Sequence, residues 1–131
     1  MDIRAYAVAD REGCLAVLDS VGGAGREEFA AYLDGGPRYF VAEHDGRIVG
    51  CGGIGAGQLE WGMVRLEMQR QGLGRFLLYY RMRELGKLGN FEHVQVRAPR
   101  GAAGFYAGQG FREASGDGHW VVMTKRLAVC G

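Results

Sequence analysis

The spacing of hydrophobic and polar positions changes along the chain, and each change predicts a different element. Residues 3–8 alternate as a strand does. Residues 11–21 repeat their apolar positions at helical spacing behind Asp10, a favourable N-cap residue. A second helix is expected over 26–35, with acidic residues in its first turn and Gly35 at its end. The chain is therefore expected to begin with a strand and two helices.

A hairpin and a further strand are expected next. Asp45 and Gly46 separate two apolar stretches, 38–44 and 47–54. This dipeptide favours a type I′ turn, because both central positions of that turn need positive φ. Residues 58–66 then predict a third strand of the same antiparallel meander.

The second half of the chain alternates between helical and extended patterns. Residues 72–88 predict a helix, whose apolar arc comprises Leu73, Phe76, Leu77, Leu85 and Leu88. A strand over 91–98, a short helix over 100–109 and a closing hairpin over 111–127 follow. The predicted order is β-α-α-β-β-β-α-β-α-β-β, a mixed α/β fold in a single domain spanning 1–131.

Composition narrows the class of protein. The chain has 131 residues and a formal net charge of +1, which argues against broad electrostatic binding to nucleic acid or to a membrane surface. Its three cysteines, Cys14, Cys51 and Cys130, lack the spacing of a disulfide framework or a zinc site. Cys14 and Cys51 are expected to be small buried hydrophobes. With no signal peptide or membrane-spanning run in the sequence, a cytoplasmic protein without a metal is expected.

The stretch QRQGLGR, residues 69–75, places two glycines at the start of a predicted helix. The first backbone N–H groups of a helix have no partner within it, and the helix dipole makes that end positive. Gly72 and Gly74 leave these N–H groups uncovered, and Arg70 and Arg75 add full charges, so the loop suits a phosphate or pyrophosphate. A tight strand-to-helix turn with solvated arginines explains the stretch equally well.

A second glycine motif has a different interpretation. Residues 50–55, GCGGIG, match the pattern GxGxxG of dinucleotide-binding loops. That fingerprint requires a strand, a turn and then a helix, whereas this stretch lies within a predicted hairpin. These glycines are therefore expected to mark a β-bulge or a close approach between backbone segments.

Residues 61–78, read as a strand, a loop and a helix, resemble the GNAT superfamily of acyl-CoA-dependent N-acyltransferases. The family signature R/Q-x-x-G-x-G/A is matched by Gln69, Gly72 and Gly74. A second match, FYAGQGF at residues 105–111, is similar to the family's aromatic-Tyr-x-x-x-Gly-Phe segment on the helix after the fifth strand. The order of elements also agrees along nearly the whole chain. The resemblance implies a sheet that splays apart between its fourth and fifth strands.

The resemblance also implies roles for individual residues. The amides of the loop would hold the pyrophosphate of the co-substrate acetyl-CoA, and those of the fourth strand would pair with its pantetheine arm. Either the Met63 or the Val64 amide would polarise the thioester carbonyl. Tyr106 matches the tyrosine that protonates the leaving thiolate, although a packing role beside Phe105 and Phe111 is the alternative. The implied cofactor contacts are Gly62, Met63, Val64, Arg70, Gln71, Gly72, Leu73, Gly74 and Arg75.

The catalytic base is where the sequence departs from the family. Many relatives place a carboxylate on the fifth strand, where this chain has Gln95, and the Asn or Thr that often follows that strand is replaced by residues 98–100, Ala-Pro-Arg. Glu60 is the best replacement, since alternation along a strand would put it on the same side as Gly62 and Val64.

Other candidates for the base or for ligand contacts have simpler interpretations. A surface ion pair is the alternative role for Glu60. His93 and His119 are secondary candidates, each more often structural, and His44 is expected to be exposed in the hairpin turn. Trp61 and Met63 are expected to pack in the core.

The expected function is transfer of an acetyl group from acetyl-CoA to a primary amine by direct attack. A non-catalytic acyl-CoA-binding module and a phosphate-ligand-binding domain remain alternatives. The acceptor would be a small-molecule or peptide amine, contacted by the loops at 21–25 and 115–119. No nucleic-acid or membrane partner is expected, and the protein would be a monomer or a homodimer.

Overall fold

The elements of the structure, a computed structural model that describes residues 1–127, follow the predicted order. The first half contains β1 (Asp2–Ala5), α1 (Arg11–Ser20), α2 (Arg26–Asp34), β2 (Arg38–His44), β3 (Arg47–Gly55) and β4 (Gln58–Val64). The second half contains α3 (Leu73–Gly86), β5 (His93–Pro99), α4 (Ala103–Gly108), β6 (Arg112–Gly116) and β7 (Trp120–Arg126). Short 3-10 turns precede α1, α3 and α4.

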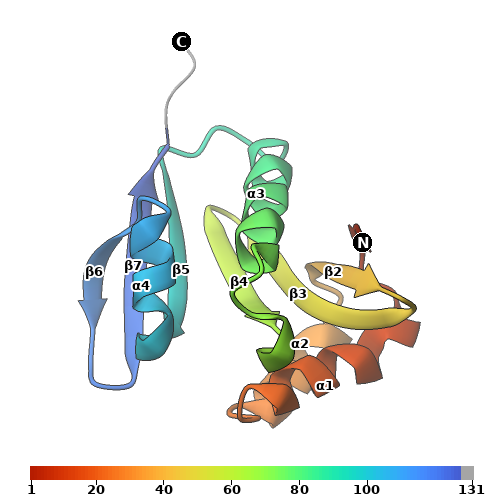
Figure 1. Ribbon diagram of the computed structural model, residues 1–131. Coiled ribbons are helices and arrows are strands. Elements are labelled where there is room, and N and C mark those ends of the chain that lie inside the picture. Colours follow the sequence, from red (N-terminus) through yellow and green to blue (C-terminus); the bar gives the residue numbers. More distant parts are fainter. Residues whose placement is uncertain (128–131) are drawn as a thin grey trace.

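The strands form one sheet in the order β1-β2-β3-β4-β5-β7-β6. The neighbours pair antiparallel except β4 and β5, which are parallel. These two strands pair only at Gln58 with Gln95 and at Leu59 with Val96, after which they separate (Figure 1). The mixed sheet and its splay between the fourth and fifth strands are thus confirmed.

The two larger hydrophobic clusters lie on opposite faces of the sheet, and a smaller third cluster contains Ala42, Val49 and Leu73. The first packs α3 and α4 against the sheet and contains Leu78, Leu85 and Tyr106. The second packs α1 and α2 against β2–β4 and contains Leu18 and Phe29. Along β5, residues alternate between buried and exposed, so one face of the β5–β7 part is exposed, while α4 covers the other (Figure 1).

The turn chemistry is as predicted, but the buried face of the long helix is different. Asp45 and Gly46 have φ of 52° and 74°, as a type I′ turn requires. In α3, Phe76 is 57% exposed although it was expected to be buried. The buried face of α3 instead contains a row of residues spaced by four, Leu73, Leu77, Arg81 and Leu85, in which Arg81 is only 3% exposed.

The cysteines that the structure describes are buried and free, as expected for Cys14 and Cys51, and Cys130 lies outside the described residues. The thiol pKa of Cys14 is raised by its hydrogen bond with Cys51 and by burial. Among residues 1–127, no helix has the length and apolar character needed to cross a membrane.

Candidate functional site

The loop before α3 presents a row of unused backbone donors. Gly72 caps the helix with φ of 82°, and Arg70 also has a positive φ, 64°. The first amide of this region to find a backbone acceptor is that of Phe76, which donates to the Gly72 carbonyl at 3.0 Å. Within the described part of the chain, the amides from Arg70 to Arg75 have no acceptor. Such a row at a positive helix end can hold an anion.

Side chains of the same loop fix its path. The Gln69 Nε2 donates to the Val64 carbonyl at 3.1 Å, which folds the loop back onto β4. A Cβ added at Gly74 would lie 3.5 Å from the Phe105 ring and 3.8 Å from Val64. The hydrogens of Gly74 therefore face the space between α3, α4 and β4, which a larger side chain would fill.

The edge of β4 that faces β5 is open beyond Leu59. The Arg65 amide donates to the Val49 carbonyl at 2.8 Å, so it points toward β3. Successive amides of a strand point to alternate sides. The Met63 amide therefore points toward β3, as that of Arg65 does, and the Val64 amide points toward the side of β5. Of the two amides predicted to polarise a carbonyl, the Val64 amide alone faces the open edge.

A β-bulge reorients the side chains of β4. Trp61 and Gly62 lie opposite the single residue Gly52, and Trp61 has a φ of 44°. The Tyr39 hydroxyl donates to the Trp61 carbonyl, and the Trp61 ring packs 4.9 Å from that of Phe29, measured between centroids.

The prediction that Glu60 shares a face with Gly62 and Val64 is therefore wrong. Glu60 contacts Tyr32 of α2, whereas Gly62 faces Arg81 of α3 and Val64 packs with Leu73 of α3. The extra residue in the bulge shifts the alternation by one position.

Arg81 explains two of the glycines in the hairpin. Its guanidinium donates to the Gly53 carbonyl through Nε at 3.2 Å and Nη2 at 3.0 Å, and to the Glu60 carbonyl through Nη2 at 3.0 Å. A Cβ at Gly52 would lie 2.6 Å from Nε, and one at Gly62 would lie 2.5 Å from Nη1. The 50–55 motif therefore accommodates a bulge, as predicted, and the buried Arg81 side chain. The predicted close approach of backbone also occurs, since a Cβ at Gly50 would lie 3.2 Å from the Met63 carbonyl oxygen and one at Gly53 would lie 3.0 Å from that of Arg38.

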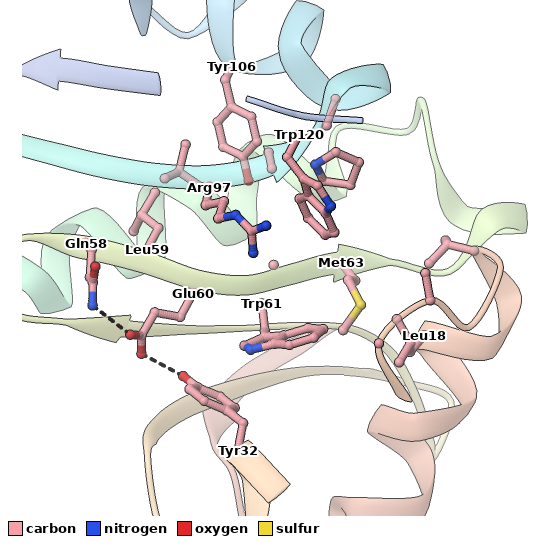
Figure 2. Close-up of a pocket in the computed structure, with 18 of the residues that line it drawn as sticks. Leu18, Tyr32, Gln58, Leu59, Glu60, Trp61, Met63, Arg97, Tyr106 and Trp120 are labelled. Atoms are coloured by element: carbon pink, nitrogen blue, oxygen red, sulfur yellow. Dashed lines mark hydrogen bonds between the residues drawn. The ribbon is translucent and has the colours of Figure 1, made fainter. Parts of the chain in front are cut away.

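A cavity of about 630 Å³ opens where β4 and β5 separate (Figure 2). It is lined from the α3–α4 face by Leu59, Val96, Ala98, Ala102 and Tyr106, and from the α2 face by Glu28, Tyr32, Glu60, Trp61, Met63, Arg97 and Trp120. Because the lining comes from both faces, the cavity passes through the sheet at the splay. Groups entering from opposite faces can meet there.

Glu60 is held on one wall of this cavity. The Tyr32 hydroxyl donates to Oε1 at 2.9 Å, and the Gln58 side-chain amide donates to Oε2 at 2.9 Å (Figure 2). Burial and the hydrogen bond to Glu60 raise the pKa of Tyr32, so this hydroxyl remains a donor at neutral pH. Each carboxylate oxygen keeps a lone pair for a further donor.

Tyr106 approaches the same cavity from α4. Its ring packs against Phe105 and Phe111, with centroids 5.1 Å and 5.4 Å away, and the residue is 6% exposed. The hydroxyl end points into the cavity (Figure 2). Tyr106 therefore packs as the alternative expected and also reaches the cavity, while its role toward a thiolate stays a prediction.

Other predicted residues lie elsewhere. His93 and His119 are exposed and do not line the cavity, and the same is true of His44 in the turn. The 21–25 loop contributes to the lining, as predicted, but the 115–119 loop does not. Arg100 donates to the Asp117 carbonyl of that second loop at 2.7 Å.

Sequence reasoning missed many of the lining residues, and those with polar or aromatic side chains include Glu28, Tyr32, Arg97 and Trp120. For Arg97 a signal existed: Val94, Val96 and Ala98 alternate as a buried face, which leaves Gln95 and Arg97 on the other.

Comparisons with known proteins agree with this geometry. A family model described as an acetyltransferase (GNAT) domain matches residues 35–113. The ribosomal-protein-S18-alanine N-acetyltransferase from Escherichia coli superposes with a TM-score of 0.80 at 20% identity, covering 99% of this chain and 96% of that one. The PaiA N-acetyltransferase from Thermoplasma acidophilum, in complex with coenzyme A, has a TM-score of 0.72 at 18% identity, covering 96% and 98%. A search of curated proteins gave no significant match.

Proposed function

The chain belongs to the GNAT acetyltransferase family, and from that premise we propose that it transfers an acetyl group from acetyl-CoA to a primary amine. Residues 1–131 would form a single domain for this reaction. The observation that carries the proposal is the cavity through the sheet, because it brings the open edge of β4 together with a carboxylate and a tyrosine hydroxyl. The row of free amides lies outside this lining, in the loop that Gln69 ties to the end of the same strand.

Acetyl-CoA binding is assigned to the α3 loop and the open edge of β4. The amides of residues 70–75 donate to the pyrophosphate, and the side chains of Arg70 and Arg75, which are exposed, add positive charge beside it. Residues 62–64 lie at the edge that β5 leaves unpaired, where a pantetheine amide chain can take the place of a strand. The Val64 amide supplies the donor for the thioester carbonyl.

The transfer itself needs one group that accepts a proton and one that donates a proton. The amine nitrogen forms a bond to the thioester carbon, and the carbon–sulfur bond breaks. The ammonium loses two protons on its way to the amide. Glu60 takes the first, directly or through a water molecule, so that the free amine can attack. Tyr106 gives its proton to the departing thiolate, and the second nitrogen proton, lost from the tetrahedral intermediate, passes through water to the tyrosinate. When bound, acetyl-CoA supplies an activated acyl group, so no covalent intermediate on the protein is needed.

The test combines binding with turnover. Thermal unfolding is followed with acetyl-CoA, with desacetyl CoA and with ATP, and CoA release is followed with a panel of primary amines. We expect both CoA species to raise the melting temperature more than ATP does, and CoA release to depend on an amine. Stabilisation without release by any amine would indicate a binding module, and equal stabilisation by ATP would contradict the acyl-CoA assignment.

A further inference from the structure

The cavity carries opposite charges on facing walls. If the proposed function holds, these charges indicate which charged groups the acceptor carries. Glu60 and Arg97 both line it, one from β4 and the other from β5. The two strands pair at Gln58 with Gln95, so Glu60 and Arg97 each lie two residues further along the same face. They are therefore level with each other across the splay.

Contacts of their own hold these two side chains apart. Tyr32 and Gln58 bind the Glu60 carboxylate on the α2 side. The Arg97 guanidinium carbon lies 4.3 Å from the centroid of the Trp120 ring, over its face. In the described residues Arg97 forms no ion pair, whereas Arg100, three residues later, is bound to Glu113 at 2.8 Å. A carboxylate and a guanidinium thus face one cavity without neutralising each other (Figure 2).

A ligand that satisfies both groups must carry a cation and an anion close together. Glu60 and Arg97 directly follow the last paired residues, Leu59 and Val96, where strands that normally lie about 5 Å apart begin to diverge. A ligand whose own positive and negative groups are a short distance apart therefore fits best. This part of the lining also includes an apolar and aromatic surface, made by Leu18, Val21, Trp61 and Met63. It offers space and contact for an uncharged side chain.

We propose that the acceptor is a free α-amino acid with an apolar or aromatic side chain, whose ammonium group lies at Glu60 and whose carboxylate is bound by Arg97. The carboxylate then fixes the nitrogen beside the base, and the side chain lies against Trp61 and Met63. Glu28, also on the wall, adds a second negative charge on the α2 side that disfavours acidic side chains. Arg97 is in this account a specificity-determining residue.

Matched pairs of acceptors test the proposal. L-Phenylalanine is compared with phenethylamine, and L-leucine with isoamylamine, because each pair differs by the carboxylate alone. CoA release should favour the amino acid in kcat/KM by roughly ten- to a hundredfold, the range of one charge-assisted pair of hydrogen bonds. Arg97→Gln should remove most of that preference while changing kcat/KM for the amines less than about threefold. Arg126→Gln, at the far end of β7, is the matched control and should behave as wild type.

A second readout does not depend on turnover. Calorimetric titration of L-phenylalanine into CoA-saturated protein should show binding that Arg97→Gln weakens and Arg126→Gln does not. Equal use of amines and amino acids by the wild type, a preference for a polyamine or a peptide, or an equal loss for both members of a pair in Arg97→Gln would overturn the proposal. If acetyl-CoA itself fails to bind, the proposed function fails first, and the amino-acid assignment fails with it.

Discussion

Replacing Gly62 by alanine should destabilise the fold through a single contact with Arg81. The added Cβ would lie 2.5 Å from Nη1 and 3.1 Å from Cζ of a guanidinium that is almost fully buried. The backbone at Gly62 is not in the left-handed region, so alanine itself is not strained there. The clash can be relieved only if Arg81 moves away from its carbonyl partners.

The size of the effect follows from those partners. Arg81 holds the carbonyls of Gly53 and Glu60 at 3.0–3.2 Å. Weakening one hydrogen bond to a charged donor costs about 1.5–3 kcal/mol, and a reduced entropy of the unfolded chain returns about 0.4–1 kcal/mol. We expect a net loss of about 1.5 kcal/mol in the free energy of unfolding. For 131 residues this lowers the melting temperature by roughly 5 °C.

A double-mutant cycle isolates the contact. Urea unfolding is measured for wild type, Gly62→Ala, Arg81→Met and the double variant. Arg81→Met leaves two buried carbonyls without their donor, so it is destabilising by itself. It also removes the group with which the added Cβ would clash, so the stability losses of the two single variants should not add. The double variant should be more stable than the sum predicts by about 1.5 kcal/mol. Additivity within about 0.5 kcal/mol would refute the assigned contact. Gly86→Ala, at the end of α3 with open space around it, is the control and should not destabilise.

Three further predictions concern the proposed reaction. Gly74→Val should raise the Kd for acetyl-CoA at least tenfold by filling the space beside Phe105, whereas Gly118→Val, in open space far from that loop, should not; wild-type affinity in a folded Gly74→Val would show that the amides are misassigned. Tyr106→Phe should lower kcat by roughly ten- to a few hundredfold with little change in acetyl-CoA affinity, and an unchanged kcat under rate-limiting chemistry would exclude the acid role. With an alkylamine acceptor, Glu60→Gln should depress kcat/KM near neutrality, and activity should recover as pH rises toward the pKa of a lysine-like ammonium group, about 10.4; a pH profile that overlays the wild type would instead point to an ordered water.

Local sequence patterns were sufficient to predict the order of the elements and the free amides of the loop before α3. The Asp45-Gly46 turn follows from its need for positive φ, and the exposed donors at residues 70–75 follow from a helix that starts at a glycine. The splay between β4 and β5 was reached through the family resemblance alone.

The bulge in β4 could not be predicted from alternation, because its causes are distant in the sequence. Trp61 adopts positive φ where Tyr39 binds its carbonyl and Phe29 packs on its ring. Strict alternation assumes that each residue of a strand lies opposite one residue of its neighbour. The bulge breaks this assumption, so alternation predicts the wrong face for Glu60. The cavity nevertheless includes Glu60, since it passes through the sheet to the α2 side.

Arg81 was missed for a different reason. Its position, four residues from Leu77 and four from Leu85, belongs to the buried row of α3, but a charged residue is normally assigned to the surface. Its burial depends on carbonyls of β3 and β4 and on two glycines without side chains. Only the tertiary structure brings these groups together.

The most direct test of the central claim is a titration of the ¹⁵N-labelled protein with CoA, followed through its backbone amide resonances. The account predicts that the largest changes fall on the amides of residues 70–75 and on Val64 at the open edge of β4, with smaller changes along β1 and β6. Saturable binding that leaves the 70–75 amides unmoved and shifts resonances elsewhere would contradict it.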